Sequence, residues 1–247
     1  MSNRPTAWIP HALARSLAAS LLVAFVGASS FAFADVGAGL RAIDQGDFEG
    51  AIGAFEAAIA ADADDARAHL LLARAAVYAA AELPEDADAE REALFARAAD
   101  MADRAVDLAP EDPDAHFEVA RALGRLAQYR GVLQSLNLAA RVERALERTL
   151  ELDPDHAAAW HARGLFHHDV PWIAGGRRGS VAPSFERAIA LEPDEITHRL
   201  AFAQVLVDRD DAAGAIAQLE VAVALRAPTY LERKDLEAAR ALLAELR

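Results

Sequence analysis

Apolar and alanine positions recur every three or four residues along most of the chain, and short acidic turns separate these runs. This spacing is typical of helices that bury one face. Several runs end at an acidic turn that carries a proline, as at Pro110, Pro154 and Pro193. The pattern predicts five helical hairpins and a final amphipathic helix, at about 36–62, 65–109, 113–153, 156–192, 195–226 and 229–246.

The residue composition agrees with this pattern. Alanine, leucine, arginine and glutamate dominate, whereas runs rich in valine, isoleucine and threonine are nearly absent. The first group favours helices and the second favours strands. We therefore expect an all-α protein, and its length of 247 residues suffices for one sizeable domain or a short repeat array.

The formal net charge of −14 and the absence of cysteine exclude several classes of function. Nucleic acid and anionic membrane surfaces repel a strongly acidic protein, so we expect neither as a partner. Without cysteine, the chain has no disulfide, no thiolate zinc site and no cysteine nucleophile.

The first 34 residues have the pattern of a secretory signal peptide. Arg4 and Arg15 give a positive start, residues 16–28 are an apolar run, and Ala32–Ala34 places small residues where a signal peptidase reads them. The apolar run is shorter than the roughly 20 residues of a membrane-spanning helix. We expect cleavage before Asp35 and, in a bacterium, a periplasmic or secreted protein with no stable membrane insertion. The alternative is a retained N-terminal anchor.

The spacing between hairpins is uneven. The first small or apolar marker of each second helix falls at positions 51, 98, 142, 181 and 215, so the steps shrink from 47 through 44 and 39 to 34 residues. The distance from each turn to the next first helix stays constant. The residues by which the first three steps exceed the last one therefore lie between the two helices of hairpins two, three and four. There they predict long helices or an added lobe along one edge of the array.

The fourth hairpin carries the clearest motif. Trp160 and Gly164 lie one helical turn apart on its first helix, and Phe185 and Ala188 share a face of its second helix, before Pro193. A large residue and a small one, followed by aromatic-x-x-Ala and a closing proline, resemble the tetratricopeptide repeat.

This resemblance to the tetratricopeptide repeat superfamily covers about residues 36–228. It implies that residues 35–247 form a single right-handed solenoid of about five hairpins, whose open end the last helix caps. It also implies that the first helices line a concave groove. Hairpins two and three depart from the pattern by their insertions, and Val142 and Thr149 stand where small residues are expected.

A narrower resemblance rests on the order Leu-Asp-Pro, tryptophan, glycine, a Gly-Gly loop and Phe-x-x-Ala-x-x-Leu-x-Pro. It is carried by Leu152–Pro154, Trp160, Gly164, Gly175–Gly176 and Phe185–Pro193. This order resembles two divergent relatives of the repeat. One is the bacterial T-component associated with TRAP solute transporters, and the other is the regulator-of-microtubule-dynamics family.

Arginines and aromatic residues face the groove in the predicted register, and each set steps by three or four residues along one helix face. The sets are Arg67, Leu70, Arg74 and Tyr78 in hairpin two, Phe117, Arg121 and Arg125 in hairpin three, and His161, Leu165 and His168 in hairpin four. Guanidinium groups would bind a carboxylate of a peptide C-terminus, an acidic helix or an organic acid, at roughly 1.5–3 kcal/mol for each hydrogen bond. The alternative is a solvated surface on which the arginines pair with neighbouring carboxylates, at about 0–1 kcal/mol for each pair.

The histidines of the fourth hairpin have poor spacing for a metal site. His167 and His168 point about 100° apart on a helix, and His161 shares no helical face with His167. His156 and Asp169 do not complete a known zinc motif. We therefore expect helix-surface or groove histidines and no bound metal.

A glycine-rich loop, Trp172–Ser180, joins the two helices of the fourth hairpin. Its glycines fit neither the P-loop nor the dinucleotide fingerprint. We expect Trp172 to pack back onto the hairpin while the glycines turn the chain. Alternatively, Trp172, Arg177 and Arg178 contact a partner.

The sequence shows no catalytic constellation. Its carboxylates lie mostly in helix-start turns, where capping and the helix dipole explain them. We expect no enzyme activity and no cofactor, and we interpret the chain as an exported adaptor or scaffold. It would hold a protein or peptide, possibly an acidic one, in the groove. The alternative is a solute-transport accessory that handles a small organic acid together with a binding-protein partner. A groove long enough for a peptide favours the first function, and a closed apolar pore favours the second.

Overall fold

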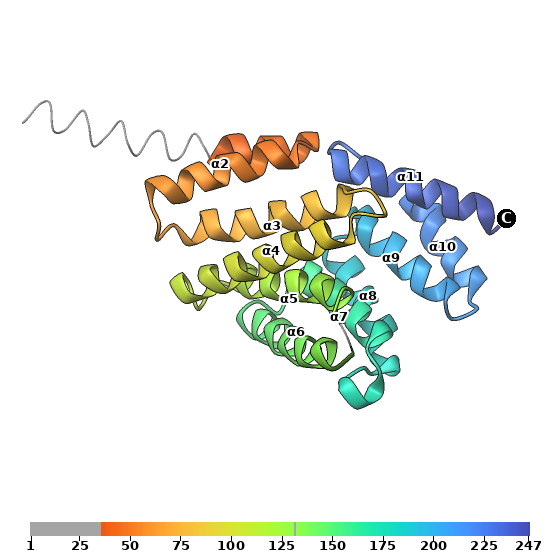
Figure 1. The fold of residues 1–247 in the computed structure, drawn as a ribbon. Helices are drawn as coiled ribbons and strands as arrows, with labels where there is room; N and C mark the ends of the chain where they lie inside the picture. The colour runs from red at the N-terminus through yellow and green to blue at the C-terminus, as the bar shows by residue number, and fades with distance from the viewer. Residues whose placement is uncertain (1–35, 131) are drawn as a thin grey trace, which may run out of the picture.

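The computed structural model describes residues 36–130 and 132–247 (Figure 1). The predicted signal peptide, residues 1–34, lies outside the described residues. Every regular element of the described residues is a helix, and the predicted fold class, an all-α solenoid of stacked hairpins with a C-terminal capping helix, is confirmed. Among these helices, none combines the length and the apolarity that crossing a membrane requires.

Consecutive helices pair into five antiparallel hairpins. The first hairpin joins a helix over 36–45 to α2. The remaining elements are α2 (Phe48–Ala61), α3 (Ala66–Glu82), α4 (Asp88–Leu108), α5 (Pro113–Ala127), α6 (Val132–Leu152), α7 (Ala157–Asp169), η1 (Trp172–Ala174), η2 (Arg178–Ser180), α8 (Val181–Leu191), α9 (Ile196–Val207), α10 (Ala212–Ala222) and α11 (Tyr230–Glu245).

The acidic turns begin the helices, as their composition predicts. The side chains of Asp47, Asp65, Asp112 and Asp211 each accept a backbone N–H in the first turn of the helix that follows. Thr229 begins α11 in a reciprocal capping box with Glu232. These contacts satisfy N–H groups that have no partner inside their own helix.

A large aromatic ring fills the space above a glycine in two of the hairpins. Phe185 of α8 is fully buried, and a Cβ atom at Gly164 of α7 would lie 2.7 Å from its ring. Phe55 of α2 stands in the same relation to Gly39, where a Cβ atom would lie 2.5 Å away. Close approach of the paired helices therefore depends on a glycine on one side and a ring on the other.

The extra residues of hairpins two and three lengthen their helices. Helices α4 and α6 each have 21 residues, whereas α9 has 12 and α10 has 11. In hairpin four the helices stay short, and the excess forms the segment that contains η1 and η2. The prediction of long helices is thus confirmed for the two hairpins with the largest steps.

Helix α11 caps the last hairpin and also reaches the first one. Its apolar face packs against α9 and α10. At its start, the ring of Tyr230 lies against Gly46 and 5.9 Å from the ring centre of Phe48. The Tyr230 O–H donates to Glu82 at 3.0 Å, and Lys234 pairs with the same carboxylate at 2.5 Å. The two ends of the solenoid therefore touch, and Figure 1 shows α11 beside the hairpin that contains α2.

We predict that Tyr230→Ala weakens this junction. The lost ring contacts and hydrogen bond should lower the free energy of unfolding by about 1–2 kcal/mol, and amide hydrogen exchange should rise in α11. Tyr230→Phe is the matched control, because it keeps the ring and loses only the contact with Glu82. Unchanged exchange in α11 of Tyr230→Ala would show that the two ends do not support each other.

Candidate binding groove

Four of the predicted groove residues come together. Arg74 and Tyr78 on α3, with Phe117 and Arg121 on α5, line one cavity of about 350 Å³. The rest of its wall is Asp114, Asp153, Asp155, His156, Ala157, Ala158 and Glu192. The cavity thus lies across first helices of successive hairpins and the turns that lead into them.

A buried carboxylate joins the two arginines. Glu118 on α5 has a side chain that is 0% exposed, and its Oε1 accepts the Nε–H of Arg74 at 2.7 Å. One Nη atom of Arg121 lies 3.4 Å from the same oxygen. Burial works against the charge of Arg74, but the charge of Glu118 and the hydrogen bond to it prevail and raise the pKa of Arg74 above its usual value. The guanidinium group of Arg74 therefore stays charged, and both arginines lie against one carboxylate.

Aromatic rings hold Arg121 in place. Its guanidinium carbon lies 4.6 Å from the ring centre of Phe117 and 5.6 Å from that of Tyr78, which are cation–π distances. An Nη–H also donates to the Tyr78 hydroxyl at 3.2 Å. The ring centre of Phe117 also lies 4.8 Å from that of His156, with the two rings tilted by 48°. These contacts fix the arginine before any ligand arrives.

Carboxylates line the part of the cavity nearest the turns. Asp114 accepts a hydrogen bond from Nε2 of His156 at 3.2 Å, since Nδ1 of this histidine already accepts the backbone N–H of Ala159. This hydrogen bond, together with the charges of Arg74 and Arg121, lowers the pKa of Asp114. The acidic residues of this wall cannot be recognised as site residues from the sequence, because each stands in a helix-start turn where a capping role explains it.

A histidine pair adjoins the cavity through Glu192. Nδ1 of His161 on α7 lies 3.1 Å from Nδ1 of His198 on α9, and Nε2 of His198 lies 3.1 Å from Glu192. The distances fit a chain in which His161 donates to His198 and His198 donates to Glu192. Burial and, to a smaller extent, the charges of His198, Arg121 and Arg125 together lower the pKa of His161 to about 3.

This pair gives a prediction about pH. A histidine whose folded pKa is about 3 stays neutral while the unfolded chain, with a value near 6.5, takes up a proton. Stability should therefore be lost as pH falls from 6.5 toward 3. In urea unfolding at pH 7, 6 and 5, this loss should be smaller in His161→Gln, which lacks the group. A difference between the two proteins that does not change with pH would contradict the prediction.

The remaining predicted groove residues lie outside the cavity. Arg67 is exposed in the first turn of α3. Arg125 lies one turn beyond Arg121 and is exposed. His168, at the end of α7, lies 3.2 Å from Asp208. The groove set therefore divides into the cavity group, the Arg125–His161 region and two outlying residues.

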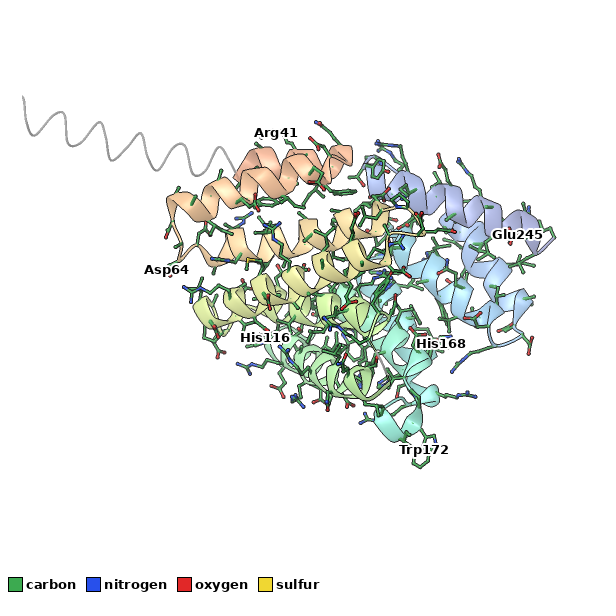
Figure 2. All side chains as sticks on the ribbon, in the orientation of Figure 1. Arg41, Asp64, His116, His168, Trp172 and Glu245 are labelled. Atoms are coloured by element: carbon green, nitrogen blue, oxygen red, sulfur yellow. The ribbon has the colours of Figure 1, made fainter. Side chains whose placement is uncertain are left out.

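The loop of the fourth hairpin forms a second cavity, of about 530 Å³. It is lined by His168, Asp169, Val170, Pro171, Trp172, Gly176 and Arg178. Figure 2 shows Trp172 at one extremity of the molecule. The expectation that Trp172 packs back onto the hairpin is wrong, because its side chain is 84% exposed and that of Ile173 is 69% exposed.

The backbone closes this loop without the indole. Gly175 has a φ of 101°, in the left-handed region that favours glycine. A Cβ atom at Gly176 would lie 1.7 Å from the carbonyl oxygen of Val170, so only glycine fits there. A guanidinium N–H of Arg177 donates to Glu143 at 3.3 Å, and the backbone carbonyl of Arg178 accepts a hydrogen bond from Arg209 at 3.0 Å. Within the described part of the chain, no three potential ligands converge into a metal site.

Stacked helical hairpins, with a ring set over a glycine in two of them, define a tetratricopeptide repeat protein. The structure of TTC0263 from Thermus thermophilus, described as a thermophilic TPR protein, matches with a TM-score of 0.68 at 20% identity, over 85% of this chain and 99% of that one. MamA from Desulfovibrio magneticus RS-1 gives 0.48 at 17% identity, over 85% and 96%. YrrB, described as a TPR protein with an unusual peptide-binding site, gives 0.43 at 15% identity, over 78% and 84%.

The sequence also places the chain in a family. Residues 41–173, more than half of the chain, match the family described as Regulator of microtubule dynamics protein 1-3, and the chain belongs to this family. Of the two narrower resemblances drawn from the motif order, this one is confirmed. The match begins in the first hairpin and ends within η1, so Gly175–Gly176 and Phe185–Pro193 lie beyond it. None of the curated proteins compared with the chain matches it.

Proposed function

We propose that the protein is a binding scaffold that holds a segment of a protein or peptide in the cavity between α3, α5 and α7. The observation that carries this proposal is the preformed cluster of Arg74, Tyr78, Phe117 and Arg121 on one wall. Each guanidinium group has five N–H donors, and the contacts with Glu118 and Tyr78 use only some of them. Donors therefore remain on both arginines for a carboxylate of a partner.

The arginines are positioned at no cost to the binding step. An exposed arginine loses side-chain freedom when it binds, which weakens binding by about 0.5–1.5 kcal/mol for each immobilised side chain. Arg74 is held here by Glu118, and Arg121 by Glu118, Phe117 and Tyr78. A partner therefore meets a rigid surface, and tight packing of these residues supports selective binding.

A solute-transport accessory is the second candidate function. Two observations favour it. The cavity of about 350 Å³ is of a size that suits a small molecule. Tyr230 also packs against Gly46 and Phe48 of the first hairpin, so the last helix contacts both ends of the solenoid. The lining of this cavity is mostly polar and charged rather than apolar, which is unlike the apolar pore that a transport function would favour.

We also propose that the chain is exported and acts in the periplasm or outside the cell. The support is the sequence pattern of residues 1–34. Mass spectrometry of the protein purified from its native envelope tests this proposal, since export with cleavage predicts a chain that begins at Asp35. A chain that keeps the first 34 residues would instead support a retained anchor.

The binding function is tested by crosslinking and pull-down from native extract with wild type and Arg121→Gln. This variant leaves Glu118 paired with Arg74 and should fold. Arg141→Gln is the matched control, because Arg141 on α6 pairs with Asp103 at 2.8 Å outside the cavity. A partner that wild type and Arg141→Gln capture, and that Arg121→Gln loses, supports the proposal. Equal capture by all three proteins would contradict it.

A further inference from the structure

Charges of both signs line the cavity. Arg74 and Arg121 stand in the middle of α3 and α5, and four carboxylates, Asp114, Asp153, Asp155 and Glu192, stand in or next to the turns that lead into α5, α7 and α9. We propose that the ligand is zwitterionic, with one carboxylate for Arg74 and Arg121 and one cationic group for the acidic turns. This inference rests on the proposed binding function and names the chemistry of its partner.

The arginine end has room for one negative charge. Arg74 and Arg121 carry two positive charges, and the buried carboxylate of Glu118 balances one of them. A single carboxylate from the ligand would balance the other. A second carboxylate would meet the excess negative charge of the wall, and Oε2 of Glu118 is itself buried without a hydrogen-bond partner within the described residues. A dicarboxylate or a strongly acidic peptide therefore fits poorly.

The acidic end has an acceptor that is still available. Asp155 is paired with Arg187, and Glu192 accepts from His198. The carboxylate of Asp153 accepts only a local backbone N–H, that of Asp155, at 3.0 Å, and it forms no ion pair within the described residues. A cationic group of the ligand would find its partner at Asp153.

The extent of the cavity along α5 limits the length of the ligand. Asp114, beside the acidic turns, and Arg121 are seven residues apart on α5, which is about 10 Å along the helix axis. An extended lysine or arginine residue, with its carboxylate at one end and its amino or guanidinium group at the other, has nearly this reach.

Two sources supply this chemistry. One is the free C-terminus of a protein or peptide that ends in lysine or arginine, and the other is the free basic amino acid. The cavity of about 350 Å³ accommodates either. The arginines alone, considered in the sequence, favour an acidic partner; the carboxylates that the fold places beside them reverse this preference.

The test uses rhodamine-labelled hexapeptides Gly-Ser-Gly-Ala-Ala-X, in which X is lysine, alanine or glutamate, each with a free or an amidated C-terminus. Fluorescence anisotropy with the purified protein should give the lowest Kd for lysine with a free carboxylate. Amidation should raise Kd at least tenfold, and so should the change from lysine to glutamate. Glutamate peptides that bind as tightly as lysine peptides, or lysine peptides that do not bind, would overturn the inference.

Two variants separate the two ends of the site. In Asp153→Asn the preference for lysine over alanine should disappear while the effect of amidation remains. The asparagine oxygen still caps Asp155, so the turn should fold. In Arg121→Gln the effect of amidation should shrink at least fivefold, and Arg141→Gln should behave as wild type. An Asp153→Asn protein that keeps its full lysine preference would contradict the assignment of the acidic end.

Competition with free L-lysine identifies the source. Displacement of the peptide at a comparable concentration supports the amino acid, and no displacement supports the C-terminus of a protein. Failure of this inference is distinguishable from failure of the binding function. A partner captured in the pull-down and lost in Arg121→Gln, without a lysine preference in the peptides, would leave the scaffold in place and remove only the zwitterionic ligand.

Discussion

Replacing Glu118 with alanine is expected to lower the free energy of unfolding by about 3 kcal/mol, because it leaves two arginines without the carboxylate that they share. Glu118 is fully buried, while Arg74 and Arg121 keep 26% and 21% of their side-chain exposure. Because water reaches both arginines to this extent, the loss of free energy of unfolding should lie at or below the lower end of the range that is usual for breaking a buried ion pair. In a domain of this size the melting temperature should drop by roughly 6–12 °C.

Glu111→Ala is the control for this prediction. Glu111 also binds an arginine, Arg148, at 2.9 Å, but its side chain is exposed. Exposed pairs contribute about 0–1 kcal/mol, so this variant should melt within a few degrees of wild type. Thermal unfolding followed by circular dichroism measures both. If Glu118→Ala costs no more than Glu111→Ala, the two groove arginines do not depend on the buried carboxylate.

The second large effect is expected where Phe185 packs over Gly164. Phe185→Ala removes a fully buried ring that also stacks on Phe202 at 5.1 Å, and it should cost about 3–5 kcal/mol. Gly164→Ala should cost about 1–3 kcal/mol in the wild type, because the new Cβ would lie 2.7 Å from the ring.

The two substitutions should not be additive. In Phe185→Ala the ring is gone, so Gly164→Ala meets no obstacle and should stabilise α7 by about 1 kcal/mol through its higher helix propensity. The sign of the Gly164→Ala effect thus reverses between the two backgrounds, and urea unfolding of all four proteins measures it. The same cost for Gly164→Ala in both backgrounds would show that the ring and the glycine do not determine the packing of this hairpin.

The helices and their pairing could be predicted from the sequence because the signals are local. Acidic residues such as Asp65 and Asp112 cap the helices that follow them, and the apolar stripes decide which face is buried. The Gly164–Phe185 contact joins residues of one hairpin, so a motif of fixed spacing reveals it. The spacing of three and four residues also predicted that Arg74 and Tyr78 share one face of their helix and that Phe117 and Arg121 share one face of theirs. The structure brings these four residues together in one cavity.

The missing parts of the site depend on contacts between hairpins. Glu118 is separated from Arg74 by 44 residues, and a glutamate within a helix is usually exposed. A charged residue set between Phe117 and Val119, on a helix with many buried positions, was the available signal. The contact of Tyr230 with Glu82 spans 148 residues and follows from the curvature of the whole solenoid, which no local pattern encodes. The Trp172 prediction failed because two glycines close the loop by themselves.

Site-specific photocrosslinking in living cells tests most directly whether a partner occupies the cavity between α3, α5 and α7. A benzoylphenylalanine replaces Tyr78 in the cavity, Trp172 at the exposed loop or Glu147 on the outer face of α6, in three separate proteins. The proposed function predicts a crosslinked product from position 78 that is absent at position 147 and is lost when Arg121→Gln is added. A product from position 172 or 147, with none from position 78, would contradict it and move the binding surface away from the groove.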